Sequence, residues 1–326
     1  MSFPLRERPG ICPTPLLAST RPRRITLTVF DPDLLTETVR DAGLEHRQLH
    51  PGPFLGELVR AEVGGLPIDR GCYSQTLLAR GGFSPTRITI GFLLSDREPG
   101  YINGIRSRAN DLVVFPEGEE LDYVLPAATE WGTVQFERDA LLAAGIPEGC
   151  LRRMSVISPQ AGQHNRLVRL MRSAVDGNVS PQEQHAFRDA VLEDLYQALD
   201  PQRKQCRGAN FHDRTNLVRR FERLVDEAGA EKRAIPELAQ ALGIARRTLE
   251  QVFRDYVGLP PARYVAMLRL NAMRRELLQA SEDNLRVAEL AARYGVVHLG
   301  RFAGDYRQMF GELPSQTLRR APCEAR

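Results

Sequence analysis

The sequence has no long hydrophobic run. None of its 326 residues lies in a stretch approaching the roughly 18 apolar residues that a membrane-spanning helix requires. The first residues, Met1 to Pro9, also lack the apolar core of a signal peptide. We therefore expect a cytoplasmic protein with no membrane partner. Its length is sufficient for two domains with cores of their own.

Cysteine and histidine are few and scattered. The five cysteines are odd in number and form no CxxC pair, which favours free thiols in a reducing compartment over disulfides or zinc. None of the six histidines belongs to a His-x-His pair, the start of many sites for divalent ions. His46 and His50 precede Pro51-Gly52 in a loop-like stretch, where we expect them to be exposed to solvent. The sequence predicts no metal and no cofactor.

One short phrase occurs twice near the C-terminus. It reads Glu-Leu-Ala-Gln-Ala-Leu-Gly at 237–243 and Glu-Leu-Ala-Ala-Arg-Tyr-Gly at 289–295. After each copy come an apolar anchor, an aromatic residue, a glycine and a proline. These are Leu249, Phe253, Gly258 and Pro261, then Phe302, Tyr306, Gly311 and Pro314. A repeated supersecondary unit explains this match.

Each copy predicts a short helix, a tight turn and a second helix. Gly243 and Gly295 stand where the first helix must end, a position that often needs positive φ. The small Ala239 and Ala292 suit a close crossing of two helices. The second helix of such a helix-turn-helix can enter the DNA major groove.

The two copies, joined by an uninterrupted amphipathic segment at 261–280, resemble the C-terminal domain of the AraC/XylS family of transcriptional regulators. The resemblance covers about the last 110 residues. Two positions depart from it: Ala245 replaces a usual helix-capping serine, and Val296 replaces a usual phenylalanine. Because a cap contributes on the order of 1 kcal/mol, the fold should survive, although the helix start can shift. The matching residues are Ile235-Pro-Glu-Leu-Ala, Thr248-Leu249, Phe253, Gly258, Arg269-Leu270, Ala272, Leu277-Leu278, Leu290-Ala291-Ala292, Tyr294-Gly295, Arg301-Phe302, Tyr306, Phe310-Gly311 and Pro314-Ser315.

The N-terminal half predicts short strands separated by turns. Asn103-Gly104, set between apolar residues, is typical of a type I′ hairpin. A short helix is expected at 34–42. Many short strands predict a sandwich or barrel, and residues 110–118 resemble a segment of the cupin-like sensor domains of the same family. The expected strands are 25–30, 55–63, 73–79, 87–94, 111–115, 121–125 and 133–137.

The predicted fold class is therefore α+β: an N-terminal cupin-like barrel with flanking helices, then an all-α domain of two helix-turn-helix motifs. We expect a sensor and dimerisation domain at 1–200, with the barrel at about 24–137 and helices at about 138–200. A linker at 201–212 would precede the DNA-binding domain at 213–326. Amphipathic helices at 163–175 and 181–199 either pack on their own barrel or form a dimer contact.

Charge differs between the two halves. Residues 206–326 hold 21 Lys and Arg against 15 Asp and Glu, a net charge of +6, whereas residues 1–205 have a net charge of −3. A basic C-terminal domain fits phosphate contact at that end of the chain. Chance variation in surface charge would explain the difference equally well if it stood alone.

The first recognition helix should bury Leu249, Val252 and Phe253. By analogy with the family, we expect Arg247, Glu250 and Gln251 to read bases, because arginine, glutamine and glutamate can hydrogen-bond base edges. Arg246 and Arg254 are expected to contact phosphates. Such contacts position the protein on the duplex but do not distinguish one base sequence from another. The outward-facing candidates of this helix are Arg246, Arg247, Thr248, Glu250, Gln251 and Arg254.

The second recognition helix has fewer long polar side chains that could reach a base. Its candidates are His298, Leu299, Arg301 and Arg307, whereas Gly300 and Gly304 cannot read a base. We therefore expect the first half-site to be specified more sharply than the second.

The resemblance implies a transcriptional activator that responds to a small-molecule effector and is not an enzyme. Its expected partners are double-stranded DNA, with half-sites in successive major grooves, RNA polymerase, an unidentified effector and a second copy of the chain. Two alternatives stay open: a DNA-repair-type methyl-accepting regulator, which needs an activated cysteine, and a non-specific structural DNA binder. Barrel aromatics are expected in the core rather than in a pocket, and Arg87, Arg106 and Arg108 would suit an anionic effector.

Overall fold

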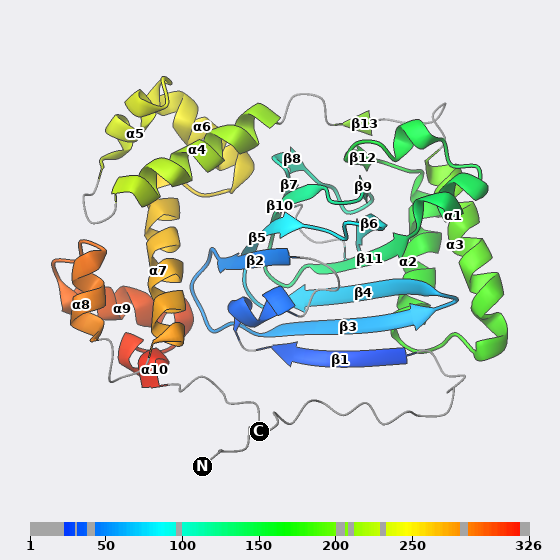
Figure 1. The fold of residues 1–326 in the computed structure, drawn as a ribbon, viewed down its shortest axis with the longest axis horizontal. Helices are drawn as coiled ribbons and strands as arrows, with labels where there is room; N and C mark the ends of the chain where they lie inside the picture. Colours follow the sequence, from blue (N-terminus) through cyan, green and yellow to red (C-terminus); the bar gives the residue numbers. More distant parts are fainter. Residues whose placement is uncertain are drawn as a thin grey trace, which may run out of the picture.

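A computed structural model of the protein describes residues 23–29, 31–37, 43–95, 100–199, 206–207, 212–228, 233–280 and 286–319. Two β-sheets with flanking helices form the N-terminal domain, and a group of helices forms the C-terminal domain (Figure 1). The predicted α+β class, with a β-rich N-terminal part and a helical C-terminal part, is confirmed. The expected linker at 201–212 lies largely outside the described residues.

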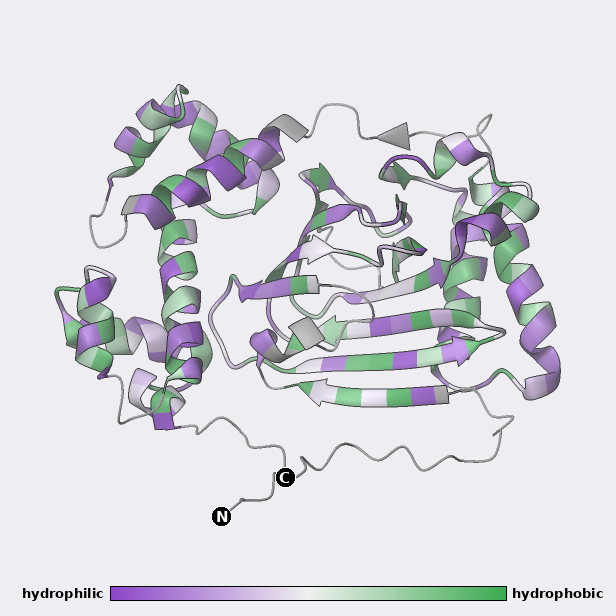
Figure 2. Cartoon of the chain, in the orientation of Figure 1, coloured by the Kyte–Doolittle hydropathy of each residue, from purple (hydrophilic) through white to green (hydrophobic). Residues whose placement is uncertain are grey.

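Both sheets consist of antiparallel pairs. The larger sheet has the order β1 (Arg23–Val29), β3 (Gly56–Val63), β4 (Leu66–Tyr73), β11 (Glu130–Phe136), β6 (Ile88–Leu93), β9 (Leu112–Phe115), β12 (Ser155–Ile157) and β13 (Cys206–Arg207). The smaller sheet has the order β2 (Gly43–Gln48), β5 (Leu77–Gly82), β10 (Glu120–Leu125), β7 (Tyr101–Ile102) and β8 (Ile105–Arg106). Strand β3 shows hydrophobic and hydrophilic bands, and its Val59, Ala61 and Val63 belong to the core of the larger sheet (Figure 2).

Most predicted strands are present, but two predictions for this region are wrong. The strand expected at 73–79 spans the end of β4, a turn and the start of β5. Strand β2 occupies residues that we expected to form a loop, because Leu44 is its only apolar side chain and no alternation of apolar residues marks it. The helix expected at 34–42 is a 3-10 helix over Pro32–Glu37, and residues 38–42 lie outside the described chain.

The Asn103-Gly104 hairpin is confirmed. It joins β7 to β8 with φ of 47° at Asn103 and 78° at Gly104, the two positive angles of a type I′ turn. The Asn103 amide also donates to the Glu120 carbonyl at 3.0 Å and accepts from the Asp122 N–H at 2.6 Å. These bonds fix the hairpin to the neighbouring strand β10.

Helices α2 (Ala161–Val175) and α3 (Gln184–Ala198) pack against the larger sheet. Their buried residues Leu167, Met171, Phe187 and Val191 belong to one core with residues of β3, β6 and β11. Packing on their own barrel is therefore confirmed for these apolar faces. The shorter elements nearby are α1 (Arg138–Ala143) and the 3-10 helices Glu148–Cys150 and Pro181–Glu183.

The C-terminal domain has two separate cores connected by one long helix. The first contains residues of α4 (His212–Ala228), α5 (Ile235–Ala241) and α6 (Arg246–Tyr256); the second contains residues of α8 (Val287–Arg293), α9 (Leu299–Phe310) and α10 (Pro314–Arg319). Helix α7 (Pro261–Gln279) runs from one group to the other and contributes to both cores (Figure 1). Among the described helices, none is long and apolar enough to cross a membrane.

Helix α7 also covers the exposed edge of the smaller sheet. The Asn271 side chain accepts from the Gln48 backbone N–H at 3.0 Å and donates to the Gln48 carbonyl at 2.8 Å. An amide side chain thus occupies the place of a further strand beside β2. Edge strands need such protection, because their unpaired backbone groups otherwise invite pairing with another chain.

We predict that Asn271→Leu lowers the free energy of unfolding by about 2–6 kcal/mol. Two buried backbone groups of Gln48 would lose their partners, at about 1–3 kcal/mol each. Urea denaturation followed by circular dichroism measures the change. Gln279→Leu, at an exposed position of the same helix, is the control and should change little. Equal stability of the two variants would show that this edge contact is unimportant.

Candidate functional site

The two helix-turn-helix units share one turn geometry. Gly243, between α5 and α6, has φ of 71°, and Gly295, between α8 and α9, has φ of 65°. Only glycine adopts this left-handed conformation without steric cost. Ala239 is buried as predicted, but the expectation for Ala292 is wrong: Ala292 is exposed and Ala291 is the buried residue. Ala291 has the same position in the second phrase as Ala239 in the first, so both copies of the repeat bury the same alanine.

The predicted inward faces are confirmed. Leu249 and Phe253 of α6 are fully buried, and Phe302 of α9 is 6% exposed. The Phe253 ring lies 5.2 Å from Tyr264, and the Phe302 ring lies 5.8 Å from Tyr306, between centroids. The first contact joins α6 to α7, whereas Phe302 and Tyr306 both belong to α9, which the Tyr306 hydroxyl joins to Thr317 of α10 at 2.9 Å.

The outward face of α6 is polar. Arg246, Arg247, Thr248, Gln251 and Arg254 are exposed and Glu250 is partly exposed. Three hydrogen bonds connect these side chains along the helix: Arg246 to Glu250 at 2.8 Å, Gln251 to Asp255 at 2.8 Å and Arg254 to Gln251 at 3.3 Å. Exposed pairs of this kind contribute little to the free energy of folding. Their polar groups can therefore leave these partners and bond to bases or phosphates instead.

Helix α6 begins at Arg246 although its N-cap residue, Ala245, makes no side-chain cap hydrogen bond. The missing serine therefore leaves the predicted start unchanged. Helix α9 begins at Leu299, with His298 as its N-cap.

The outward face of α9 carries fewer polar groups. His298, Leu299 and Arg307 are exposed, and the Arg301 side chain is 83% exposed, 3.9 Å from Asp305. Sequence reasoning missed Arg269 of α7, which lines a surface hollow together with His298 and Arg301. This gathering of basic groups beside α9 is where an anionic phosphate would be stabilised.

A buried ionic cluster connects the two domains. Asp122 of β10 accepts from the Arg80 Nε at 2.7 Å and from the Tyr256 hydroxyl. Glu222 of α4 accepts from Arg80 and from the Tyr264 hydroxyl. Burial alone would raise the pKa of Asp122, but the hydrogen bond and charge of Arg80 outweigh burial and hold that pKa below its usual range. We call these five residues the interdomain cluster.

Strands β2, β5 and β10 form a wall between the C-terminal domain and a cavity. On one face, Leu78 and Val124 join the first core of the C-terminal domain, beside the interdomain cluster. On the other face, alternate residues of the same strands line the cavity: Leu44, His46, Leu77, Ala79, Leu121, Tyr123 and Leu125. The two-residue period of a strand explains how one layer serves both sides.

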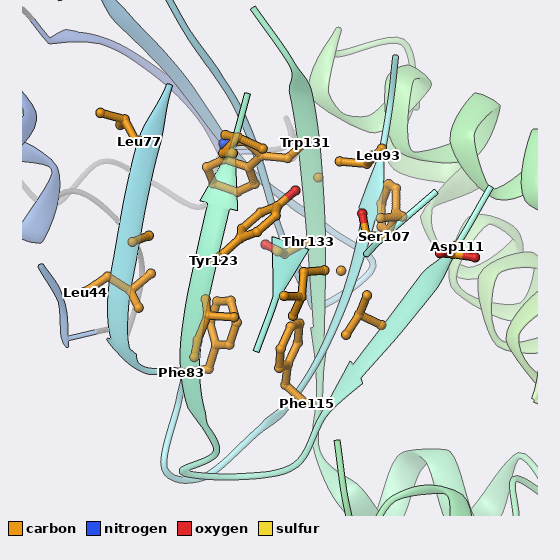
Figure 3. Close-up of a pocket in the computed structure, with 18 of the residues that line it drawn as sticks. Leu44, Leu77, Phe83, Leu93, Ser107, Asp111, Phe115, Tyr123, Trp131 and Thr133 are labelled. Carbon is orange, nitrogen blue, oxygen red and sulfur yellow. The ribbon is translucent and has the colours of Figure 1, made fainter. Parts of the chain in front are cut away.

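The cavity has a volume of ≈ 60 Å³, several times the roughly 10–15 Å³ that one water molecule needs. Side chains from both sheets point into it (Figure 3). The expectation that the barrel aromatics form core rather than pocket is wrong for the five that line this space: Tyr73, Phe92, Phe115, Tyr123 and Trp131. Phe83 lines it as well.

Glycines of the larger sheet leave room for the aromatic side chains on the side of the cavity opposite the wall. A Cβ atom at Gly71 would lie 2.4 Å from the Trp131 indole, and one at Gly132 would lie 2.8 Å from the Phe92 ring. These glycines stand directly opposite the aromatic residues in the sheet register. Glycine–aromatic pairs across strands were the sequence signal that could have revealed the cavity.

Three buried polar atoms at the cavity lack hydrogen-bond partners among the described residues: His46 Nδ1, the Tyr73 hydroxyl and the Ser107 hydroxyl. Each such atom costs about 1–3 kcal/mol when left unpaired. His46 is 3% exposed, so the prediction of a solvent-exposed histidine is wrong. Burial lowers the pKa of His46 to about 4, and its ring is neutral at physiological pH.

The described residues contain no cluster of three or more His, Cys, Asp or Glu that could hold a metal ion. Cys72 and Cys150 form no disulfide. Cys150 is buried, and its thiol donates to the Leu199 carbonyl at 3.6 Å. Arg87, Arg106 and Arg108 do not line the cavity, contrary to the suggestion of an anion site there.

Comparisons with known proteins match the C-terminal part. A family model described as a helix-turn-helix domain matches residues 238–320. The probable thc operon regulatory protein of Rhodococcus erythropolis is 38% identical over 88 residues, 27% of this chain and 26% of that protein. The XylDLEGF operon transcriptional activator of Pseudomonas putida is 36% identical over 107 residues, 32% of this chain and 33% of that protein. The chain thus matches about a quarter to a third of these relatives' length.

One solved structure resembles the same part. A probable AraC family transcriptional regulator from Rhodopseudomonas palustris CGA009 is 34% identical over 32% of this chain and 97% of that chain, with a TM-score of 0.29.

We predict that Leu249→Ala and Phe302→Ala each destabilise the core that they anchor, by about 2–5 kcal/mol. Each substitution leaves a cavity among buried side chains. Leu299→Ala, on the exposed face of α9, is the control and should stay within about 0.5 kcal/mol of the wild type. Denaturant titration distinguishes them, and wild-type stability of either core variant would contradict the assignment of faces.

Proposed function

Its C-terminal domain makes this chain a member of the AraC/XylS family of transcriptional regulators, and from this premise we propose that it activates transcription by binding two promoter half-sites. The observation that carries the proposal is the pair of exposed, polar recognition helices held at the two ends of α7. Double-stranded DNA is the partner, and the site of action is the cytoplasm.

The length of α7 suits adjacent major grooves. Its 19 residues span about 28 Å at 1.5 Å per residue, close to the roughly 34 Å between successive grooves on one face of the duplex. Because α7 is buried in both cores, it fixes the distance and the rotation between α6 and α9. A net charge of +6 on residues 206–326 favours contact with phosphates.

We assign base readout to Arg247, Glu250 and Gln251. Arg247 is the strongest candidate, since it is exposed and makes no hydrogen bond or ion pair with another described residue. Thr248 lies beside it, and Arg246 and Arg254 would contact phosphates. On α9, Arg301 and Arg307 would contact phosphates, His298 would lie near the groove edge, and Leu299 would pack against a thymine methyl.

The N-terminal domain would serve as the sensor of an effector. Its cavity and the C-terminal domain share the wall of β2, β5 and β10, so a ligand that moves this wall changes the contacts of the interdomain cluster. Contact with RNA polymerase and dimerisation complete the proposed mode of action. Burial of Cys150 favours a non-enzymatic role, because methyl transfer to a thiol needs an accessible thiolate.

We predict that half-site spacing decides DNA binding. Inserting about five base pairs between the half-sites rotates one of them to the opposite face of the duplex, so a rigid α7 cannot reach both. Footprinting of the full chain should then show protection of one half-site instead of two. Equal protection at both spacings would contradict the rigid two-groove arrangement, and with it a binding mode that depends on α7.

The two recognition helices should differ in what they read. Arg247→Ala should weaken binding by about 1–3 kcal/mol and relax base preference in the first half-site. Arg301→Ala should weaken binding similarly on all sequences, because it removes a phosphate contact. Arg152→Ala, an exposed arginine of the N-terminal domain, is the control. Binding to a randomised duplex library measures all three, and an equal loss of preference with Arg301→Ala would overturn the assignment.

A further inference from the structure

We propose that the cavity binds a small uncharged molecule, mostly apolar, that carries one hydroxyl or carbonyl group. This inference rests on the proposed function, because it names the chemical class of the effector. The lining is the first reason: six aromatic rings and several aliphatic side chains surround the space. Cavities lined mostly by apolar side chains accept apolar molecules.

The charges around the cavity argue against an ion as ligand. Among its described lining residues there is no lysine or arginine. The one carboxylate, Asp111, already accepts from the Arg108 N–H at 2.6 Å and from the Ser158 hydroxyl at 2.7 Å. His46 is neutral, since burial lowers its pKa to about 4. An anionic ligand would lose its hydration, gain no counter-charge and face the carboxylate of Asp111.

The unpaired polar atoms argue for one polar group on the ligand. Tyr73 and His46 are each 3% exposed, both line the cavity, and their rings lie 6.2 Å apart between centroids in an edge arrangement. The Trp131 ring lies 6.0 Å from the Tyr73 ring, but it gives the Tyr73 hydroxyl no partner of hydrogen-bond geometry. A ligand hydroxyl or carbonyl oxygen can accept from the Tyr73 phenol, so it would satisfy that buried group.

The volume keeps the ligand small. A space of ≈ 60 Å³ exceeds the need of one water molecule several times but is well below the roughly 150 Å³ of a cavity that accepts benzene, so a ring enters only where the lining side chains move apart. Phe83 and Phe115 lie at one end of the cavity and Trp131 at the other (Figure 3). Leu44, Ala79 and Tyr123 line the wall shared with the C-terminal domain, so an occupant touches the layer that carries Arg80 and Asp122.

The test uses cyclohexanol and cyclohexanecarboxylate, which share one ring and differ in charge. Trp131 is the only tryptophan of the chain, so its fluorescence reports on the cavity alone. We expect cyclohexanol to change the fluorescence of the full chain and raise its melting temperature, with a dissociation constant on the order of 1 mM. The carboxylate should bind at least about tenfold more weakly at pH 7.5.

Two variants locate the binding. Tyr73→Phe should weaken cyclohexanol binding about tenfold, the effect of one lost hydrogen bond. Tyr101→Phe, a tyrosine that does not line the cavity, is the matched control. Ala79→Phe should fill the space and abolish binding. If Ala79→Phe does not fold, Tyr73→Phe still decides the question.

Tighter binding of the carboxylate would overturn the inference, as would an unchanged Trp131 signal with cyclohexanol up to about 20 mM, well above the expected constant. A tenfold loss with Tyr101→Phe but none with Tyr73→Phe would also overturn it. Duplex binding by the same preparation is measured without ligand. Loss of duplex binding alone would refute the proposed function and leave the cavity assignment standing, so the two failures are distinguishable.

Discussion

Two carboxylates and one guanidinium, all withdrawn from water, hold the two domains of this protein together. Asp122 and Glu222 come from different domains, and Arg80 bonds to both. Buried acids of this kind are tolerated only when they are paired, and removing one partner of a buried pair typically costs about 3–5 kcal/mol. Asp122 and Arg80 are neighbours within the smaller sheet, whereas the bonds of Arg80 to Glu222 and of Tyr256 to Asp122 exist only when the two domains are docked.

Helix α7 extends this dependence to the second helix-turn-helix unit. Arg274 donates to Asp31 at 2.6 Å and to Glu312 at 2.8 Å, and its guanidinium lies 4.7 Å from the centre of the Phe310 ring. Asn271 of the same helix pairs with the edge of β2. One helix thus sets the separation of the recognition helices and also contacts the sheet that borders the cavity. A change in the wall can reach both units through this single element.

The sequence predicted the C-terminal domain almost helix by helix, because its anchors recur at helical spacing in two copies. It predicted β2 and His46 wrongly. Glu45 and Arg47 of that strand are polar because a second domain covers them with ion pairs, for example Arg47 to Glu222 at 3.7 Å. The covering residues are far from β2 in the sequence, so the local pattern of apolar and polar residues cannot predict them. The cavity escaped prediction because an aromatic residue has the same pattern in a core and in a cavity wall.

The alternation along β2, β5 and β10 also bears on how such a protein evolves. Odd and even positions of these strands face different neighbours, one set the cavity and the other the C-terminal domain. Substitutions in the first set can alter which molecule is recognised while the docking surface keeps its chemistry. Changes at His46, Ala79 or Tyr123 can therefore reshape the cavity while Arg80 and Asp122 keep their contacts with the C-terminal domain. The lining of the cavity and the docking surface are thus free to vary separately, although they belong to the same three strands.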